Sequence, residues 1–202
     1  NSLRLRLLLR ISKRNGEIDV NQQITNILAN PATYTVFTSV ADDAIFRYPG
    51  TFPYFNPYYN ARLSDWNAGN YFTKFFLSKL NSTNDPRRTV WMTTVNVGGV
   101  PVYQGIESGY PTTLEYVVDR NSSYNDILKT IPQLGIMMTY SEVEFIKAEL
   151  ALKGFITGKT PAAHYDSGIS ASMAQWGVAL PAGFLTQAGI AYNSNVSIEQ
   201  QL

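Results

Sequence analysis

The residues of this chain that could carry acid–base chemistry are three glutamates and one histidine in its second half. Glu142, Glu144 and Glu149 could supply the carboxylate pair that glycoside hydrolysis requires. Glu142 and Glu149 share one helix face, where carboxylates are usually solvated or paired with Lys or Arg. His164 precedes Tyr165, but no Gly-x-Ser-x-Gly nucleophile turn occurs in the sequence. We therefore expect His164 at the surface, no catalytic residue and no enzyme.

Two other short motifs imitate functional sites. Gly154 and the run Gly158-Lys159-Thr160 resemble a phosphate-binding loop, but the spacing between the glycines is one residue too short and a predicted helix precedes them. We interpret this segment as a turn between helices, and Asp42-Asp43 as a turn or helix start. The absence of cysteine excludes disulfide scaffolds, cysteine-rich metal sites and thiol nucleophiles, and the single histidine removes most histidine-based metal and general-base chemistry. No metal and no cofactor are expected.

Aromatic residues give a stronger indication of binding. The chain has 26 aromatic residues, and 12 of them lie in the 31 residues from Phe46 to Phe76. Rings stack on the apolar faces of sugars, while nearby Asn, Asp and Arg side chains can bond to hydroxyl groups. The candidate ligand-binding residues are Tyr54, Tyr58, Tyr59 and Trp66. In the alternative interpretation, these rings fill a loop-rich core or a protein interface.

The composition is that of a globular protein with little net charge. The 202 residues are 45% hydrophobic and 15% charged, with a net charge of +1, so no global field attracts nucleic acid or anionic lipid. No run of 18 apolar residues is present, so nothing is expected to span a membrane. Because the chain begins at Asn1 and not at methionine, we expect it to be part of a longer protein.

The first 30 residues predict two antiparallel helices. Residues 3–14 carry leucines over a wide arc with basic residues on the remaining face, which indicates a helix buried on most of its circumference or, alternatively, one lying on an anionic membrane. Asp19 is expected to cap the second helix, which Asn30-Pro31 ends. From Tyr34 to about Tyr71 helical periodicity is lost, and 71–80 again predicts a helix.

The remaining sequence predicts a strand, a possible second strand and another helical hairpin. Residues 90–95 are rich in β-formers, and 115–118 could form a further strand. Thr139 and Glu142 form a capping box that opens a helix to about Lys153, and this helix has an apolar stripe on each of two faces. Such a helix is packed on both sides, as in stacked helical hairpins. Thr160 and Pro161 begin the next helix, which ends at Gly177.

Several segments resemble the SusD/RagB family of surface glycan-binding lipoproteins. Met138-Thr-Tyr-Ser-Glu-Val-Glu-Phe-Ile-Lys-Ala-Glu149 is similar to the family's M-T-Y-A-E-V-x-F-L-K-A-E helix. Tyr165-Asp-Ser-Gly-Ile-Ser-Ala-Ser-Met173 with Trp176-Gly177 resembles Y-x-x-G-I-x-A-S-M…W-G. Further matches, in family order, are Ser2-Leu-Arg-Leu-Arg-Leu, Asn56-Pro-Tyr-Tyr59 and Asn84-Asp85-Pro86-Arg87.

The resemblance implies a mainly α fold of tetratricopeptide-like helical hairpins, with a long irregular aromatic-rich loop region and a few short strands. It implies one incomplete family domain made of a hairpin (1–30), a loop-rich segment (31–138), a second hairpin (139–177) and an irregular tail with a truncated helix (178–202). The implied function is non-catalytic binding of oligosaccharide and its delivery to a TonB-dependent, SusC-like outer-membrane barrel. The implied location is the cell outer membrane, where a lipid anchors the full-length protein at the surface. A protein-binding helical scaffold and, less favoured, a glycoside hydrolase or esterase are the alternatives.

Overall fold

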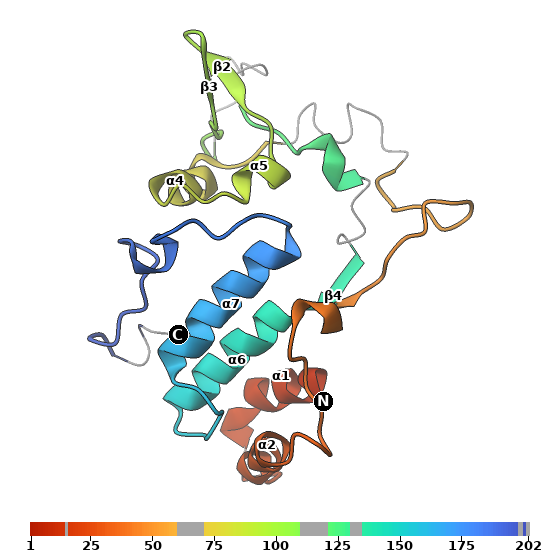
Figure 1. Ribbon diagram of the computed structural model, residues 1–202, viewed down its shortest axis with the longest axis vertical. Coiled ribbons are helices and arrows are strands. Elements are labelled where there is room, and N and C mark those ends of the chain that lie inside the picture. The colour runs from red at the N-terminus through yellow and green to blue at the C-terminus, as the bar shows by residue number, and fades with distance from the viewer. Residues whose placement is uncertain (15, 60–70, 110–120, 130–134, 198–199, 201–202) are drawn as a thin grey trace. The chain divides into compact units, whose positions relative to one another are not determined.

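The computed structural model describes every residue except 15, 60–70, 110–120, 130–134, 198–199 and 201–202 (Figure 1). The chain divides into two compact units. The helical unit comprises Asn1–Ile45, Ile136–Thr186 and Ile190–Leu202. The loop unit comprises Phe46–Gly135 and Gln187–Gly189. The expected short helix at 198–202 and the expected strand at 115–118 fall largely or wholly outside the described residues.

The predicted first hairpin is confirmed. Helix α1 (Ser2–Arg10) and helix α2 (Val20–Ala29) follow each other, and the Asp19 side chain caps α2 by accepting from the Gln22 backbone N–H at 2.9 Å. Apolar side chains spaced three and four residues apart point into the core because they share one helix face. The buried apolar residues of this pair are Leu5, Leu8, Val20, Ile24 and Ile27.

The prediction that the first helix is buried on most of its circumference is wrong for the described residues. Helix α1 ends at Arg10, followed by a 3₁₀ turn at Ser12–Arg14, and its outer residues Leu3 and Leu7 are each 51% exposed. The reason is that α1 packs against α2 and α6 on one side. The leucines of α1 span a wider part of its circumference than α2 and α6 cover, so Leu3 and Leu7 stay exposed.

The second hairpin is confirmed with the predicted caps. Helix α6 (Tyr140–Leu152) begins at the Thr139 cap, and helix α7 (Pro161–Gln175) begins at the Thr160 cap with proline in its first turn. One stripe of α6 enters the core against α1 and α2, and the other faces α7. The core stripe consists of Val143, Ile146 and Leu150, and the second stripe contains Phe145 and Ala148.

Gly168 allows α6 and α7 to approach closely. A Cβ atom at Gly168 would lie 2.9 Å from Cζ of Phe145, so any other residue there would force the Phe145 ring to shift. Gly177 follows α7 with a φ of +67°, the left-handed conformation in which glycine commonly ends helices. Two glycines therefore determine how closely α7 packs against α6 and where α7 ends.

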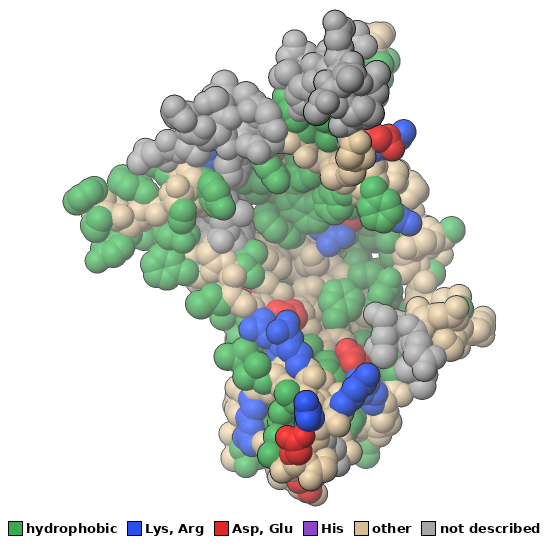
Figure 2. All heavy atoms as spheres, turned by 180° about the vertical axis from the view of Figure 1, so that it is seen from behind, with side chains coloured by type: hydrophobic (Ala, Val, Ile, Leu, Met, Phe, Trp, Pro, Cys, Tyr) green, Lys and Arg blue, Asp and Glu red, His purple; other side chains and the backbone are tan. Residues whose placement is uncertain are grey.

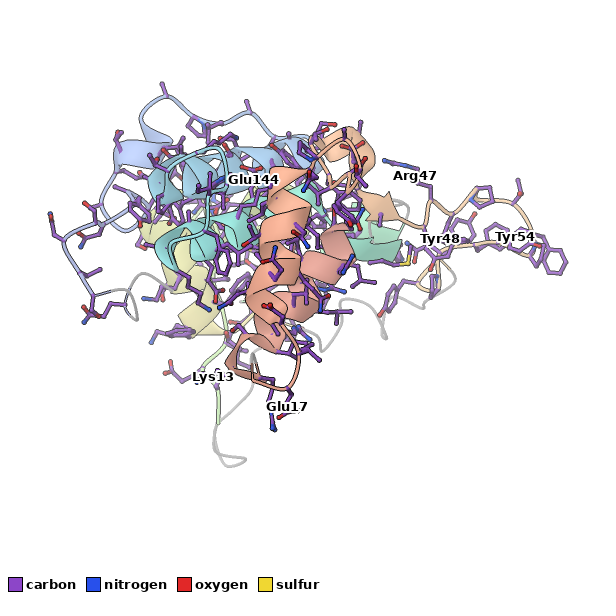
Figure 3. All side chains as sticks on the ribbon, turned by 90° about the horizontal axis from the view of Figure 1, so that it is seen from below. Lys13, Glu17, Arg47, Tyr48, Tyr54 and Glu144 are labelled. Carbon is purple, nitrogen blue, oxygen red and sulfur yellow. The ribbon has the colours of Figure 1, made fainter. Side chains whose placement is uncertain are left out.

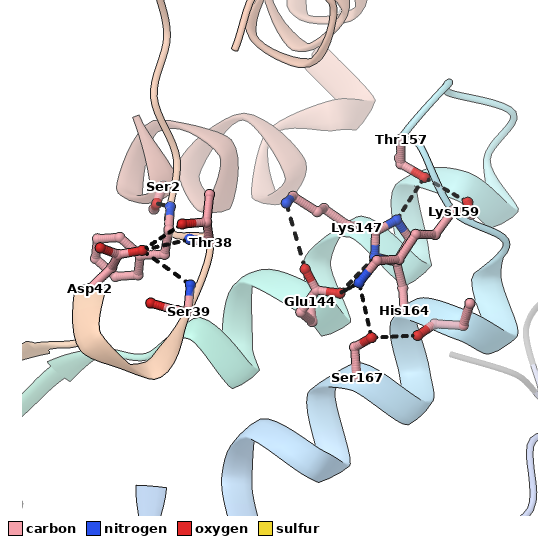
Figure 4. A network of polar contacts seen from close by, with 12 residues as sticks. Ser2, Thr38, Ser39, Asp42, Glu144, Lys147, Thr157, Lys159, His164 and Ser167 are labelled. Carbon is pink, nitrogen blue, oxygen red and sulfur yellow. Dashed lines mark hydrogen bonds and ion pairs between the residues drawn. The ribbon is translucent and has the colours of Figure 1, made fainter. Parts of the chain in front are cut away.

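Short elements complete the helical unit. Strand β1 (Ala44–Ile45) pairs antiparallel with β4 (Ile136–Met138), and the 3₁₀ turns are η2 (Val40–Asp42) and η6 (Phe184–Thr186). Asp42 accepts from the backbone and hydroxyl of Thr38 and from the backbone of Ser39 (Figure 4). These bonds, above all the one from the Thr38 backbone, lower the pKa of Asp42. The interpretation of Asp42-Asp43 as a turn or helix start is confirmed.

The described residues of the loop unit form two helices, a β-hairpin and a 3₁₀ turn. Its elements are α4 (Lys74–Ser82), α5 (Arg88–Trp91), β2 (Val95–Val97), β3 (Val100–Val102) and η4 (Asp126–Lys129). Thr73 caps α4, close to the predicted start of that helix. The small core consists of Leu77, Leu80 and Met92, and Phe72, Trp91 and Tyr103 pack on it.

The prediction of a strand at 90–95 is wrong. Residues Arg88–Trp91 form α5, and strand β2 begins only at Val95. Asp85, which is buried, accepts from the Arg87 backbone N–H at 2.9 Å and so turns the chain into a helical path. This local turn outweighs the β-propensity of Val90 and Trp91, which is a weak and context-dependent preference.

Candidate functional site

The segment from Phe46 to Tyr59 presents its aromatic rings to solvent. Phe52 is 86% exposed, Tyr54 61%, Tyr58 48% and Tyr59 49%. In Figure 3, Tyr54 lies at the outer end of this extended loop, and Figure 2 shows hydrophobic side chains gathered along it. Three of the four predicted ligand-binding residues therefore lie exposed in one loop, and Trp66 lies outside the described residues.

Two turns shape this loop. At its tip the Tyr54 backbone N–H donates to the Thr51 carbonyl at 2.7 Å, around a cis Phe52–Pro53 peptide bond. Closer to Tyr58, the buried Asn56 side chain accepts from the Tyr58 backbone N–H at 2.9 Å, the pattern of an Asx turn. The Asn-Pro pair thus fixes the backbone from which the tyrosines project.

The rings of the loop also support each other. Phe55 stacks on Tyr59 with ring centroids 4.7 Å apart and planes 11° apart, which covers one face of Tyr59. Phe46 meets Tyr48 edge to face at 4.8 Å. Stacked and edge-to-face pairs are favourable for rings, so the loop holds its tyrosines with little help from a core.

The structure adds a second group of rings in the loop unit, which we call the helix rings: Phe72, Phe76, Trp91 and Tyr124. Phe76 stands between Phe72 and Trp91, with centroid distances of 5.8 and 6.4 Å and planes within 24° of each other. Tyr124 meets Phe72 edge to face at 4.8 Å. Phe76 and Tyr124 are exposed, so this group presents a second aromatic surface.

An arginine is fixed beside the helix rings. The Arg87 guanidinium lies 5.1 Å from the centre of the Trp91 ring and donates from Nε to the Asp85 carboxylate at 3.0 Å and from Nη2 at 2.5 Å. This bidentate pair sets the arginine in one orientation. The sequence analysis did not select Arg87 and Trp91, because residues 90–95 were predicted to form a strand. In a helix, residues four apart lie on one face, and this spacing could have indicated the pair Arg87 and Trp91 and also the pair Phe72 and Phe76.

The prediction that His164 lies at the surface is wrong. His164 and Glu144 are each 1% exposed and belong to a network on α6, α7 and the turn between them (Figure 4). Nδ1 of His164 lies 2.9 Å from the Glu144 carboxylate, and Nε2 lies 2.9 Å from the Thr157 hydroxyl. A carboxylate 20 residues away in sequence explains the burial, because a buried polar ring must be hydrogen-bonded.

The Glu144 carboxylate is surrounded by two lysines and His164. Lys159 lies 3.2 Å away and Lys147 3.6 Å away, in addition to His164. Burial by itself raises the pKa of Glu144, but the bond to His164 and the charges of Lys147 and His164 outweigh burial and lower it to about 2. Burial, followed by the charge of Glu144, raises the pKa of Tyr140.

The contacts Thr157–His164–Glu144 follow one another in the order of a hydrolase triad, but the Thr157 hydroxyl is bonded differently. In a triad the histidine accepts the proton of the hydroxyl group. Here the Thr157 hydroxyl donates to the Lys159 carbonyl at 3.1 Å, so its proton is directed away from His164. The network stabilises the turn that carries Gly158 and Lys159, which confirms this segment as a helix–helix turn.

The other candidate acid–base residues are paired as expected. Glu142 accepts from Arg6 at 3.1 Å and Glu149 from Lys153 at 2.5 Å. Among the described residues, no group of three potential metal-binding side chains occurs, and no helix has the length and hydropathy of a membrane span.

Comparison with known proteins places the chain in a family. The family model described as "Starch-binding associating with outer membrane" (SusD-like) matches residues 1–202. No curated protein matches the chain. Thirty-four solved chains match.

Three solved structures illustrate the similarity. A SusD homolog from Bacteroides fragilis is 26% identical, with a TM-score of 0.72 over 87% of this chain and 40% of that one. A SusD homolog from Bacteroides uniformis is 22% identical, with a TM-score of 0.73 over 100% of this chain and 45% of that one. A chitin-binding SusD homolog from Flavobacterium johnsoniae is 23% identical, with a TM-score of 0.68 over 93% of this chain and 36% of that one.

The chain spans less than half the length of each of these relatives. The helical hairpins, the motifs of α6 and α7 and the match over all 202 residues agree with one another. The chain therefore belongs to the SusD-like family of starch-binding proteins that associate with the outer membrane.

Proposed function

We propose that this chain binds oligosaccharide without transforming it, through the exposed rings of the loop unit. The protein of which it forms part would deliver the sugar to a TonB-dependent, SusC-like outer-membrane barrel. The family description and the chitin-binding relative support glycan as the ligand class. A surface location and a lipid anchor in the full-length protein are part of the same proposal.

The single observation that carries the proposal is the exposure of the loop aromatics. Phe46, Phe52, Tyr54, Tyr58 and Tyr59 are all at least 48% exposed within 14 consecutive residues. Contiguous exposed apolar surface of this kind marks a binding site. Tyrosine combines a flat ring with a hydroxyl group, which suits a ligand that has apolar faces and polar edges.

The expected affinity follows from the number of rings. A ring contact contributes about 0.5–1.5 kcal/mol beyond the area that it buries. Three to four such contacts add up to about 1.5–6 kcal/mol, and the area that the rings bury adds to this, so we expect a dissociation constant of roughly micromolar to millimolar. An open loop with this affinity releases its sugar readily, as a protein that passes it on must do.

Calorimetric titration with starch- and chitin-derived oligosaccharides tests the proposal. We expect Tyr54→Ala/Tyr58→Ala/Tyr59→Ala, and separately Trp66→Ala, to weaken binding at least tenfold. The matched control is Phe75→Ala on α4, which removes a ring that is 72% exposed outside the loop. Equal affinities for wild type and the loop variants would remove these rings from the site.

The helix rings are the second candidate surface for the same ligand. Their near-parallel planes and the fixed Arg87 favour this surface if the loop variants bind normally. Phe76→Ala would then weaken binding while Phe75→Ala would not.

Two further experiments address catalysis and the transporter. Release of reducing ends from polysaccharide by the pure protein would contradict a non-catalytic role. Co-purification with a SusC-like barrel, tested on the full-length protein, is expected to persist in the tyrosine variants. Loss of the complex in those variants would instead make the loop a protein interface.

A further inference from the structure

The loop unit carries more positive charge than its own acids balance. Over its whole sequence it has eight Lys and Arg residues against six Asp and Glu residues. Its described part has six cations and three acids, and each of these acids is already ion-paired. The cations left without an acidic partner among the described residues are Arg47, Lys79 and Arg88. A ligand of this unit therefore meets uncompensated positive charge.

Two neighbouring arginines at the start of α5 show what an acidic partner changes. The Arg87 guanidinium lies 5.1 Å from the centre of the Trp91 ring and bonds to the carboxylate of the buried Asp85. The Arg88 guanidinium likewise lies 5.0 Å from the centre of the Tyr103 ring. Among the described residues, however, Arg88 bonds only to uncharged oxygens. The charge of Arg87 is thus neutralised and the charge of Arg88 is not.

The Arg88 side chain is held in one orientation. Its Nε donates to the Asp85 backbone carbonyl at 2.9 Å. Its Nη1 donates to the Asn81 side-chain oxygen at 2.6 Å, and its Nη2 donates to the Asn84 side-chain oxygen. A guanidinium has five N–H donors, so these contacts leave one N–H on each of the two Nη nitrogens. Because the side chain is already ordered, a ligand that binds it loses little affinity to side-chain entropy.

The remaining donors suit a carboxylate. Two N–H groups of one planar guanidinium match the two oxygens of a carboxylate in a bidentate pair. Arg88 is partly exposed, so a ligand can reach it. Tyr103, which supports Arg88, packs on the same small core as Phe72 and Trp91. Arg88 therefore stands in the region of the helix rings, on which a sugar could stack.

We propose that the loop unit binds acidic oligosaccharide and that Arg88 recognises the carboxylate of a uronic acid residue in it. This ligand class rests on the glycan binding proposed above and narrows it. The aromatic side chains stack on the sugar rings, and the carboxylate accepts two N–H bonds from Arg88. A neutral oligosaccharide with the same backbone makes only the stacking contacts, so it binds more weakly.

Calorimetric titration with matched pairs of sugars tests the proposal on the whole chain. The probes are oligosaccharides of galacturonate, glucuronate and mannuronate, each compared with its own methyl ester, which has the same backbone without the charge. We expect at least one uronate to bind at least tenfold more tightly than its ester. The difference should shrink as salt rises, because charge interactions at a partly exposed site are screened.

A signal from Arg88 itself locates the carboxylate. The Nε–H group of Arg88 is hydrogen-bonded, so it is suited to detection by proton–nitrogen NMR, and Arg88→Lys identifies its signal. We expect sodium glucuronate to shift this signal and glucose to leave it in place. Absence of a shift with glucuronate and with galacturonate would contradict the role of Arg88.

Two variants separate Arg88 from the general charge of the unit. Arg88→Gln should remove the preference for uronate over ester and leave ester binding within twofold. The matched control is Lys79→Gln on α4, which removes an exposed cation that also lacks an acidic partner among the described residues. It should leave the preference within twofold. Unfolding midpoints show whether each variant is folded, and the preference of the wild type is measured without any variant.

The outcomes that overturn the inference are distinct from failure of glycan binding. Equal binding of every uronate and its ester by the wild type overturns the inference and leaves the proposed function in place. No binding of any oligosaccharide overturns the proposed function as well. An Arg88 shift with a blocked aspartate peptide but not with uronates makes acidic peptide the ligand class. A uronate response in this chain that is lost in the full-length protein shows that another segment of that protein fills the site.

Discussion

The two units of this chain place their distinctive side chains in opposite environments. The helical unit buries charged groups, since Glu144 and His164 are each 1% exposed and bonded to one another. The loop unit exposes aromatic groups that usually build cores, with Phe52 at 86% and Tyr54 at 61%. The difference indicates that stability and recognition depend on separate residues, so a mutation should affect one and spare the other.

The largest predicted effect is loss of stability when the buried carboxylate is removed. Glu144→Ala leaves His164, Lys147 and Lys159 facing an empty polar site, and breaking a buried ion pair in this way costs about 3–5 kcal/mol. Urea unfolding followed by circular dichroism measures it. The control is Glu149→Ala, which removes a partly exposed pair on the same helix and should cost less than about 1 kcal/mol. Similar costs for both variants would show that the network is not a special source of stability.

The next effect is a loss of stability in acid. The folded-state pKa of Glu144 is lowered from 4.5 to about 2, so its contribution is fully present above pH 4.5 and is lost as the pH falls towards 2. The linked free energy is about 3 kcal/mol. Unfolding free energies of wild type and Glu144→Gln should converge over this range, and curves that stay parallel contradict the assignment.

A smaller effect is expected at the contact between α6 and α7. Gly168→Ala forces a methyl group against the Phe145 ring, and overpacking of this kind costs about 1–3 kcal/mol, from which about 1 kcal/mol is regained because alanine is a better helix former than glycine. Gly16→Ala is the matched control, because a Cβ there meets nothing within 4 Å. Thermal unfolding compares the two, and equal melting temperatures would show that the hairpin tolerates a wider spacing.

The smallest effect on stability is predicted for the exposed loop. Tyr54→Ala/Tyr58→Ala should change the free energy of unfolding by less than about 0.5 kcal/mol, since neither ring is in a core. A loss of several kcal/mol in urea unfolding would mean that these rings support the fold and would remove the contrast between the two units.

Local sequence signals predicted the helices well. Asp19, Thr139 and Thr160 occupy the expected cap positions because capping depends on a side chain and a backbone group three residues away. The same local reasoning failed at α5, where the buried Asp85 bonds to Arg87 and bends a β-rich segment into a helix.

Long-range contacts explain what the sequence could not predict. His164 is buried because Glu144 and Thr157 meet it after folding, and no pattern around His164 indicates those partners. For the candidate site, the composition of the sequence indicated the aromatic loop. The exposure of the loop rings and the contacts among the helix rings could be found only from the structure.

Calorimetric titration of a starch or chitin oligosaccharide into wild type and into Tyr54→Ala/Tyr58→Ala/Tyr59→Ala tests the central claim most directly, provided that both proteins have the same unfolding midpoint. Sugar recognition by the exposed loop predicts micromolar-to-millimolar binding by wild type and at least a tenfold loss in the variant. Unchanged affinity in a variant that remains fully folded would contradict it.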